Sequence, residues 1–235
     1  MNISSILSIL SLYDWLALVW FALAWALYAG YARRVNAKDS SLLQVTNRYR
    51  REWLMQTTAR DPRMIDAVIT QTLSQTPTFF CSTTILVIGG LLAVLGTSDK
   101  AAELARDIPF VARTTALVFD IKLITLVVVF VYAFFRFSWS MRQYTFVALV
   151  IGAMPPPDTF AEGKSAREAY AAKAAGLVAL AAESFNDGLR AYYFAFAVVG
   201  WFISPVVFFI ATIAVLAILY RREFKSDVLT VLQAN

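Results

Sequence analysis

The chain has 235 residues, of which 59% are hydrophobic and 16% are charged, and its mean hydropathy is +0.62. Soluble domains are about 45–50% apolar and about 25% charged, so this composition predicts an integral membrane protein. One cysteine and no histidine exclude an intramolecular disulfide framework, a Cys/His zinc site and the usual haem ligand. We therefore predict no metal and no cofactor.

Four apolar runs follow one another along the chain, and each is long enough for a membrane-crossing helix, which needs about 20 residues. They cover residues 13–32, 79–96, 114–135 and 191–220. As one helix the last run would be about 45 Å long, against a hydrocarbon core of about 30 Å, so we expect a tilt or a kink at Pro205. The pattern predicts an all-α fold, in which a four-helix transmembrane bundle with long amphipathic cytoplasmic helices forms a single domain over residues 1–235.

Lys and Arg are distributed unevenly between the segments that flank these runs. Residues 33–76 carry eight and residues 136–190 carry six, whereas the opposite side carries six, three of them in the tail at Arg221, Arg222 and Lys225. Because cytoplasmic loops are enriched in Lys and Arg, both long segments are predicted to be cytoplasmic and both termini to lie outside. The basic tail argues against this orientation, since it also favours the cytoplasmic side.

The long segments contain helical patterns of their own. Residues 41–60 and 65–73 have the spacing of amphipathic helices, and residues 164–187 form an Ala-rich helix that we expect to end at 186–188. The apolar run 142–154 is too short to span a bilayer, so we interpret it as an interfacial or re-entrant helix.

The first of these helices contains the basic stretch NRYRREW, residues 47–53. Its cationic and aromatic side chains are candidates for contact with lipid head groups. These residues are Arg48, Arg50, Arg51, Tyr49 and Trp53. The alternative, which we favour, is a positive-inside anchor that needs no specific lipid.

The third apolar run contains two charged residues, Asp120 and Lys122. Residues two apart on a helix point about 200° away from each other, so the two cannot face one partner. Counted from Arg136 at the inner end of this run, they lie about 24 Å and about 21 Å up the helix, and Asp14 lies about 28 Å above Arg33 in the first run. All three are therefore expected at one level in the outer third of the bilayer, where an Asp14–Lys122 contact is geometrically possible.

We favour a structural interpretation of this layer, with its charges paired between helices or hydrated from outside. The functional alternative is an outer-face site for an ion, a lipid head group or a quinone. Transporter sites usually lie near the midplane and often between repeats. Neither feature is visible here, so the transport interpretation is the weaker one.

Six stretches in this order resemble the bacterial branch of the domain of unknown function 599 (DUF599) family. They are NRYRREW (47–53), FFCSTTILVIGGLLAVLG (79–96), FRFSWSMRQYTF (135–146), IGAMP (151–155), GLRAYYFAFA (188–197) and LYRREFKS (219–226). The resemblance implies a multi-pass membrane protein, and we expect it in the bacterial inner (plasma) membrane. It implies no catalytic residues, because the family has no assigned reaction.

The sequence contains no P-loop, no Gly-x-Ser-x-Gly and no metal-binding motif, so we expect no enzyme. Single acidic residues in the cytoplasmic segments are interpreted as caps and solvated charges: Asp61, Asp66 and Asp158. The expected function is that of an accessory, scaffold or assembly subunit of a membrane complex or homo-oligomer. The alternative is an oligomeric channel or small-molecule transporter that uses the layer of Asp14, Asp120 and Lys122. Expected partners are membrane lipid and other membrane-protein subunits, with no nucleic acid.

Overall fold

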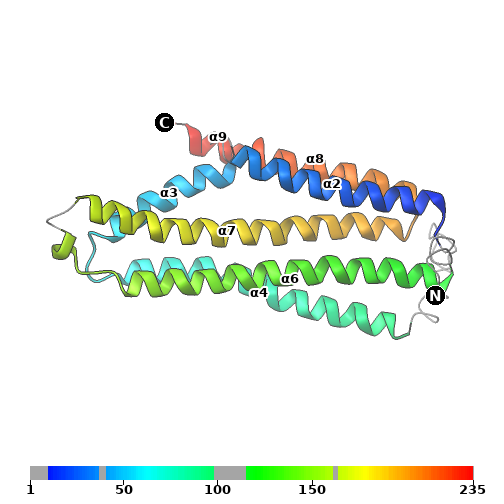
Figure 1. Cartoon of the computed structure of the whole chain (residues 1–235), viewed down its shortest axis with the longest axis horizontal. Coiled ribbons are helices and arrows are strands. Elements are labelled where there is room, and N and C mark those ends of the chain that lie inside the picture. The colour runs from blue at the N-terminus through cyan, green and yellow to red at the C-terminus, as the bar shows by residue number, and fades with distance from the viewer. Residues whose placement is uncertain (1–9, 37–40, 98–114, 161–163, 235) are drawn as a thin grey trace. The chain divides into compact units, whose positions relative to one another are not determined.

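The computed structural model describes residues 10–36, 41–97, 115–160 and 164–234. These residues form seven α-helices and one 3-10 helix and contain no strand (Figure 1). The elements are α2 (Leu12–Asn36), α3 (Leu42–Thr57), α4 (Met64–Leu95), α6 (Ala116–Gly152), η1 (Pro157–Phe160), α7 (Lys164–Trp201), α8 (Pro205–Phe224) and α9 (Asp227–Gln233). The predicted all-α membrane fold is confirmed for this part of the chain.

The described residues cluster into two compact units. Unit 1 takes in the described parts of residues 1–34, 83–133 and 189–222, and unit 2 takes in those of residues 35–82, 134–188 and 223–235. The boundaries between the units fall within helices α2, α4, α6, α7 and α8.

Four helical stretches are long and apolar enough to cross a membrane: Leu12–Val35, Met64–Leu95, Ala116–Gly152 and Pro205–Gln233. The first three overlap the first three predicted spans. The fourth predicted span, 191–220, is wrong as a single helix, because α7 ends at Trp201 and α8 begins at Pro205.

The chain breaks there for a local chemical reason. Proline has no backbone N–H and a fixed φ, which suits the first position of a helix better than its interior. The hydroxyl oxygen of Ser204 accepts a hydrogen bond from the Val207 N–H at 3.1 Å and so caps the new helix. Ser204 and Pro205 together start α8.

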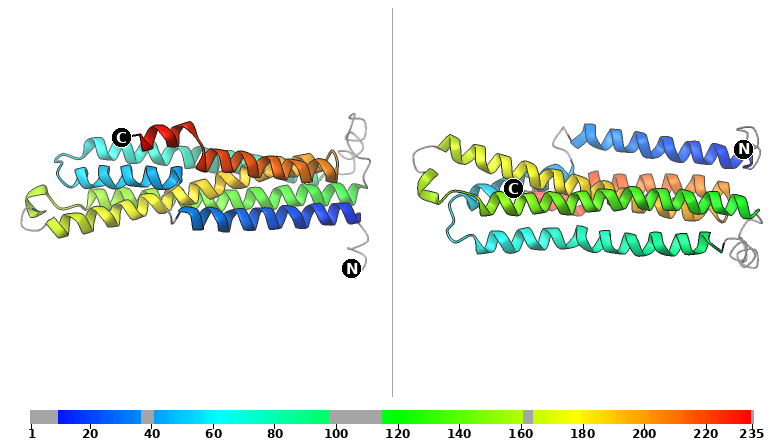
Figure 2. Two further views of the ribbon diagram at one scale, coloured as in Figure 1. Left: turned by 90° about the horizontal axis from the view of Figure 1, so that it is seen from above. Right: turned by 60° about the horizontal axis from the view of Figure 1, so that its bottom comes forward.

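Within unit 1, the end of α7 and residues 205–222 of α8 form an antiparallel hairpin (Figure 1, Figure 2). At the turn, a Cβ on Gly200 would lie 3.2 Å from Cγ1 of Val207, so the two helices approach closely. At the other end, the Arg222 guanidinium donates a hydrogen bond to the Tyr193 hydroxyl. Residues 189–201 therefore cross unit 1 in the direction opposite to α8.

Three helices are less interrupted than the sequence predicts. Helix α4 joins the amphipathic stretch 65–73 to the span and contains Pro77. Helix α6 includes most of the run 142–154, which is therefore neither an interfacial nor a re-entrant helix of its own. Helix α7 passes through 186–188 without a break. Glycine in a helix costs about 1 kcal/mol relative to alanine, which tertiary packing readily overrides.

Gly188 shows what that packing is. A Cβ at this position would lie 2.5 Å from Cε1 of Phe137, whose ring is fully buried. Phe137 in turn packs against Phe80 and Phe185. Glycine in α7 therefore makes room for an aromatic side chain of α6.

Unit 2 has a hydrophobic core to which α3, α6 and α7 contribute. Its buried members are Leu54, Tyr144, Val147, Ile151, Ala174, Val178 and Ala181. At 1.5 Å per residue, α4 is about 48 Å long and α6 about 55 Å. Even at a tilt of 40°, a hydrocarbon core of about 30 Å would leave about 10–15 Å of each helix outside it. Both helices therefore extend beyond the bilayer.

Candidate functional sites

Asp14 lies in the first turn of α2 and is 8% exposed. Its Oδ2 accepts hydrogen bonds from the hydroxyl and the N–H of Ser11, at 2.6 and 3.3 Å, while the Asp14 N–H donates to Ser11 Oγ at 3.2 Å. This reciprocal pattern is a capping box, which satisfies free N–H groups at a helix start. The other oxygen, Oδ1, accepts a hydrogen bond from the indole N–H of Trp201 at 2.7 Å. Asp14 thus starts α2 and joins it to α7.

Lys122, on α6, is 1% exposed, and its ammonium group donates a hydrogen bond to the backbone carbonyl of Trp201 at 2.9 Å. Trp201 is the last residue of α7, where carbonyl groups lack intrahelical partners and carry partial negative charge. The ammonium also lies 5.7 Å from the centroid of the Trp201 ring, within cation–π range. Lys122 therefore caps the C-terminal end of α7.

Asp14 and Lys122 meet through Trp201 rather than in a direct contact. Among the described residues, no ion pair within 4.0 Å joins their side chains. Both charges lie at the level of Trp201, as the helix rise predicts. Sequence reasoning missed Trp201, because its role depends on the α7–α8 hairpin.

Asp120 differs from its two neighbours in the layer. It is half-buried, and its Oδ1 atom is shielded from solvent without a hydrogen-bond partner among the residues that the structure describes. The contacts seen here bring Asp14 and Lys122 together and leave Asp120 apart from them, as its helical spacing predicts.

In unit 2, Asp66 is the centre of a polar cluster that the sequence did not indicate. Asp66 is 0% exposed, and its Oδ1 accepts three hydrogen bonds, each 2.7–2.8 Å long. The donors are the Trp53 indole, the Thr57 hydroxyl and the Arg60 guanidinium. The interpretation of Asp66 as a solvated charge is therefore wrong. This carboxylate holds the end of α3 against the start of α4.

Arg63 makes a second set of hydrogen bonds where α3 meets α4. Its guanidinium donates hydrogen bonds to the backbone carbonyl groups of Thr57 at 3.3 Å, of Met154 at 2.8 Å, and of Pro155. Met154 and Pro155 lie two and three residues after the end of α6. The stretches NRYRREW and IGAMP, far apart in sequence, are thus held at one junction through Asp66 and Arg63.

Helices α3 and α9 lie side by side in unit 2 (Figure 1), where the Tyr49 hydroxyl donates a hydrogen bond to the Leu232 carbonyl at 3.3 Å. The groove between them, the α3–α9 groove, has a volume of about 490 Å³. It is lined by Gln44, Val45, Asn47, Arg48, Tyr49, Arg51, Leu232, Gln233 and Ala234. Three of the five residues predicted to contact lipid head groups therefore lie in one groove.

The other two, Arg50 and Trp53, do not line this groove; both are half-buried and make side-chain hydrogen bonds within unit 2. Trp53 donates its indole N–H to Asp66 and packs against the core. Arg50 donates to the side chain of Asn47. Burial lowers the pKa of the Arg50 guanidinium from its ordinary value, and the nearby Tyr144 acts in the opposite direction.

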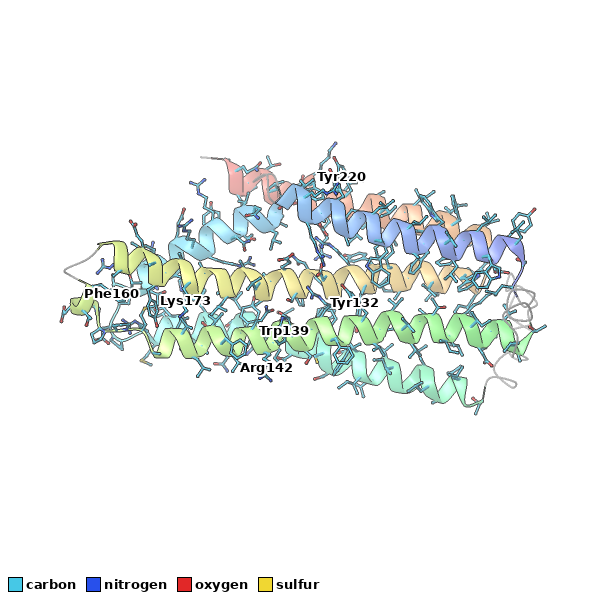
Figure 3. The ribbon with its side chains drawn as sticks, in the orientation of Figure 1. Tyr132, Trp139, Arg142, Phe160, Lys173 and Tyr220 are labelled. Carbon is cyan, nitrogen blue, oxygen red and sulfur yellow. The ribbon has the colours of Figure 1, made fainter. Side chains whose placement is uncertain are left out.

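A second groove of about 520 Å³, the α4–α6 groove, lies in unit 2 between the first turns of α4 and the last turns of α6. It is lined by Asp61, Pro62, Arg63, Ala67, Thr70, Gln71, Ser74, Met141, Tyr144, Thr145, Ala148, Ile151 and Gly152. On the same helix ends, large apolar side chains are 60–73% exposed: Met64, Ile65, Val68 and Leu149. Arg142, labelled on this part of α6 in Figure 3, is exposed and lies 5.7 Å from the Phe146 ring.

Among the described residues, no group of three or more His, Cys, Asp or Glu side chains could hold a metal ion. Four long apolar helices, with charges buried between helix ends, define a multi-pass integral membrane protein. The chain belongs to the DUF599 family, described as a protein of unknown function, whose model matches residues 16–228. No curated protein and no solved structure matches the chain.

Proposed function

We propose that this protein is a non-catalytic accessory or scaffold subunit, which binds a partner membrane protein or a second copy of itself. The proposal rests on the α4–α6 groove and on the exposed apolar side chains of the same helix ends, Met64, Ile65, Val68 and Leu149. Monomeric soluble surfaces rarely keep contiguous apolar patches uncovered, and such patches mark interfaces.

The position of the groove along its helices supports this proposal. Phe80 of α4 packs on Phe137 of α6 with ring centroids 5.3 Å apart, next to Arg136 at the inner end of the third apolar run. Counted from these rings, Val68 and Leu149 each lie about 18 Å farther along their helices. Head groups occupy about 5–8 Å on each side of the hydrocarbon core. Unless another protein covers them, these exposed apolar side chains would therefore face water rather than lipid.

The charge layer supports a non-catalytic function as well. The polar atoms of Asp14 and Lys122 are used in a capping box, an indole contact and a helix C-terminus. These contacts stabilise helix ends, which supports a structural role for both groups.

Purification in mild detergent tests the proposed function. The wild-type chain should retain a membrane protein, or its own copy, at fixed stoichiometry by quantitative mass spectrometry. Ala148→Glu places a carboxylate in the groove and should lower this recovery about ten-fold, equivalent to about 1.4 kcal/mol. Ala169→Glu, at an exposed alanine of α7 outside the groove, is the matched control and should leave the recovery within about two-fold.

Thermal unfolding of both variants shows whether they are folded. A partner that remains bound to folded Ala148→Glu, or is lost equally from Ala169→Glu, contradicts the proposal. So does a wild-type protein that is monomeric and free of stoichiometric partners.

The environment of Asp120 favours the second candidate function, an oligomeric channel or small-molecule transporter. Its shielded Oδ1 atom has no hydrogen-bond partner among the described residues, and a polar atom shielded in this way within a span is costly. A permeating cation or proton could occupy such a position. A measurement of ion flux in liposomes distinguishes the two candidates, because a channel or transporter conducts and a scaffold does not.

For the orientation, we propose the bacterial inner membrane with the N-terminus outside and the C-terminal tail in the cytoplasm. The earlier expectation that both termini lie outside depended on a single helix over 191–220. With the α7–α8 hairpin, the three basic residues of the tail lie on the same side of the membrane as the two long segments. The number of Lys and Arg residues on the cytoplasmic side then rises from fourteen to seventeen, and the number on the outer side falls from six to three. This bias agrees better with the positive-inside rule.

Cysteine labelling tests this orientation. In a Cys81→Ala background, which removes the only cysteine of the sequence, a cysteine introduced at Gln233 should resist a membrane-impermeant reagent in intact cells. A cysteine introduced at Ser11 should react with it. Labelling at position 233 in intact cells would place the tail outside and overturn the proposed orientation.

A further inference from the structure

The α3–α9 groove has the charge of an anion site. Of the nine described residues that line it, none is acidic, and Arg48 and Arg51 are both exposed. Arg51 has no hydrogen-bond partner among the described residues, and Arg48 pairs with Glu52 at 3.4 Å while their side chains are 78% and 54% exposed. Because such an exposed pair contributes at most about 1 kcal/mol, both guanidinium groups are available to a ligand.

The arginines are arranged for one anion rather than scattered. Residues 47, 48 and 51 lie on adjacent positions of one helical face, since neighbours on a helix are three or four apart. Arginine presents a planar fork that binds phosphate oxygens in pairs, and the Asn47 side chain adds a polar group beside it. The hydrogen bond from Tyr49 to Leu232 holds α9 as the opposite wall.

On their other side, the same arginines border a recess of about 330 Å³ that also contains Glu52 and Glu168. These two carboxylates disfavour an anion there. An anion is therefore expected to approach Arg48 and Arg51 from the side of α9.

The groove lies close to the membrane surface. Helix α9 begins at Asp227, three residues after α8 ends, and three residues span at most about 11 Å. The last turn of α8 contains Arg221 and Arg222, as is typical of a cytoplasmic boundary. On α9 itself, Val228 and Val231 are 56% and 71% exposed. Apolar side chains at this depth suit acyl chains beside the anion site.

We propose that the α3–α9 groove binds the phosphate of an anionic phospholipid from the leaflet at which α8 ends. Arg48 and Arg51 bind the phosphate oxygens, and the apolar side of α9 lies along the first carbons of the acyl chains. A volume of about 490 Å³ falls within the range of small-ligand sites. The inference is independent of the proposed scaffold function, because it uses a different groove.

Native mass spectrometry of the full chain, titrated in detergent with phosphatidylglycerol or phosphatidylcholine, tests the proposal. The double variant Arg48→Gln, Arg51→Gln should bind the first phosphatidylglycerol about ten-fold more weakly than wild type. The matched double variant Arg34→Gln, Arg221→Gln removes two exposed arginines outside the groove and should change the affinity less than about two-fold. Wild type should bind zwitterionic phosphatidylcholine about ten-fold more weakly than phosphatidylglycerol.

Equal losses in the two double variants would show general charge attraction and overturn the site. Equal affinity of the wild-type protein for phosphatidylglycerol and phosphatidylcholine would also overturn the proposed site. Inorganic phosphate distinguishes the sources of the phosphate group. If it displaces phosphatidylglycerol at millimolar concentration, the groove takes a free anion and the lipid assignment is wrong. Thermal unfolding at the wild-type temperature shows that the variants are folded.

Discussion

Replacing Asp66 by alanine is expected to lower the free energy of unfolding by about 3 kcal/mol, because three donors lose their common acceptor. The Trp53 indole would lose its acceptor, whereas the Thr57 hydroxyl can still donate to the Trp53 carbonyl at 3.0 Å. Both bonds to Asp66 are 2.7–2.8 Å long in the wild-type protein. Arg60 contributes less, since its side chain is 35% exposed and can be hydrated in the variant.

Asp66→Asn tests whether the hydrogen bonds to the oxygen atom cause this loss of stability. The amide oxygen can still accept from Trp53 and Thr57, so the loss should be about 1 kcal/mol. Asp158→Ala, at an exposed acidic residue of η1, should change stability by less than about 0.5 kcal/mol. Denaturant unfolding in mild detergent measures all three. If Asp66→Ala is as stable as Asp158→Ala, the cluster does not hold α3 to α4.

Replacing Trp201 by alanine should be the most destabilising change in unit 1. The side chain is 0% exposed, stacks on Phe208 with ring centroids 5.1 Å apart, and donates to Asp14. Lipid is as apolar as the helix faces, so the loss comes from packing and from the unpaired Oδ1 atom of Asp14 rather than from exposure to water. We expect a loss of about 3–4 kcal/mol.

Trp201→Phe separates these two contributions. It keeps an aromatic ring and the backbone carbonyl bound by Lys122 but removes the indole N–H, so the loss should be about 1–2 kcal/mol. In a double-mutant cycle with Asp14→Ala, the coupling energy should be at least about 0.5–1 kcal/mol.

Ser140→Ala provides the control for this cycle. Its hydroxyl donates to the Ala181 carbonyl and shares no partner with Asp14, so Ser140→Ala and Asp14→Ala should be additive within about 0.5 kcal/mol. Additivity between Trp201→Phe and Asp14→Ala would mean that the indole contact does not contribute to stability.

The sequence predicts the spans α2, α4 and α6 well, because length and hydropathy alone decide whether a helix can cross a bilayer. It fails at residues 191–220, where both arms of a hairpin are as apolar as the turn between them. The pair Ser204-Pro205 was the available signal, since it resembles a helix start more than a kink.

For the candidate site, helix rise alone predicts the common level of Asp14 and Lys122. It cannot predict that they would meet on Trp201, because that contact requires the path of α7 through unit 1. Asp66 was misjudged for a related reason. A single carboxylate beside a helix start resembles a solvated cap until α3 folds over it and brings Trp53 and Thr57 within hydrogen-bond distance.

We propose that the charges within the spans stabilise helices and do not conduct ions. Asp120 is the most critical residue for this proposal, because its Oδ1 atom has no partner among the described residues. The direct test is cation and proton flux into liposomes that contain wild-type protein or Asp120→Asn. We expect both to give the flux of protein-free liposomes. A wild-type flux that Asp120→Asn abolishes, while the variant keeps its wild-type unfolding temperature, would contradict it.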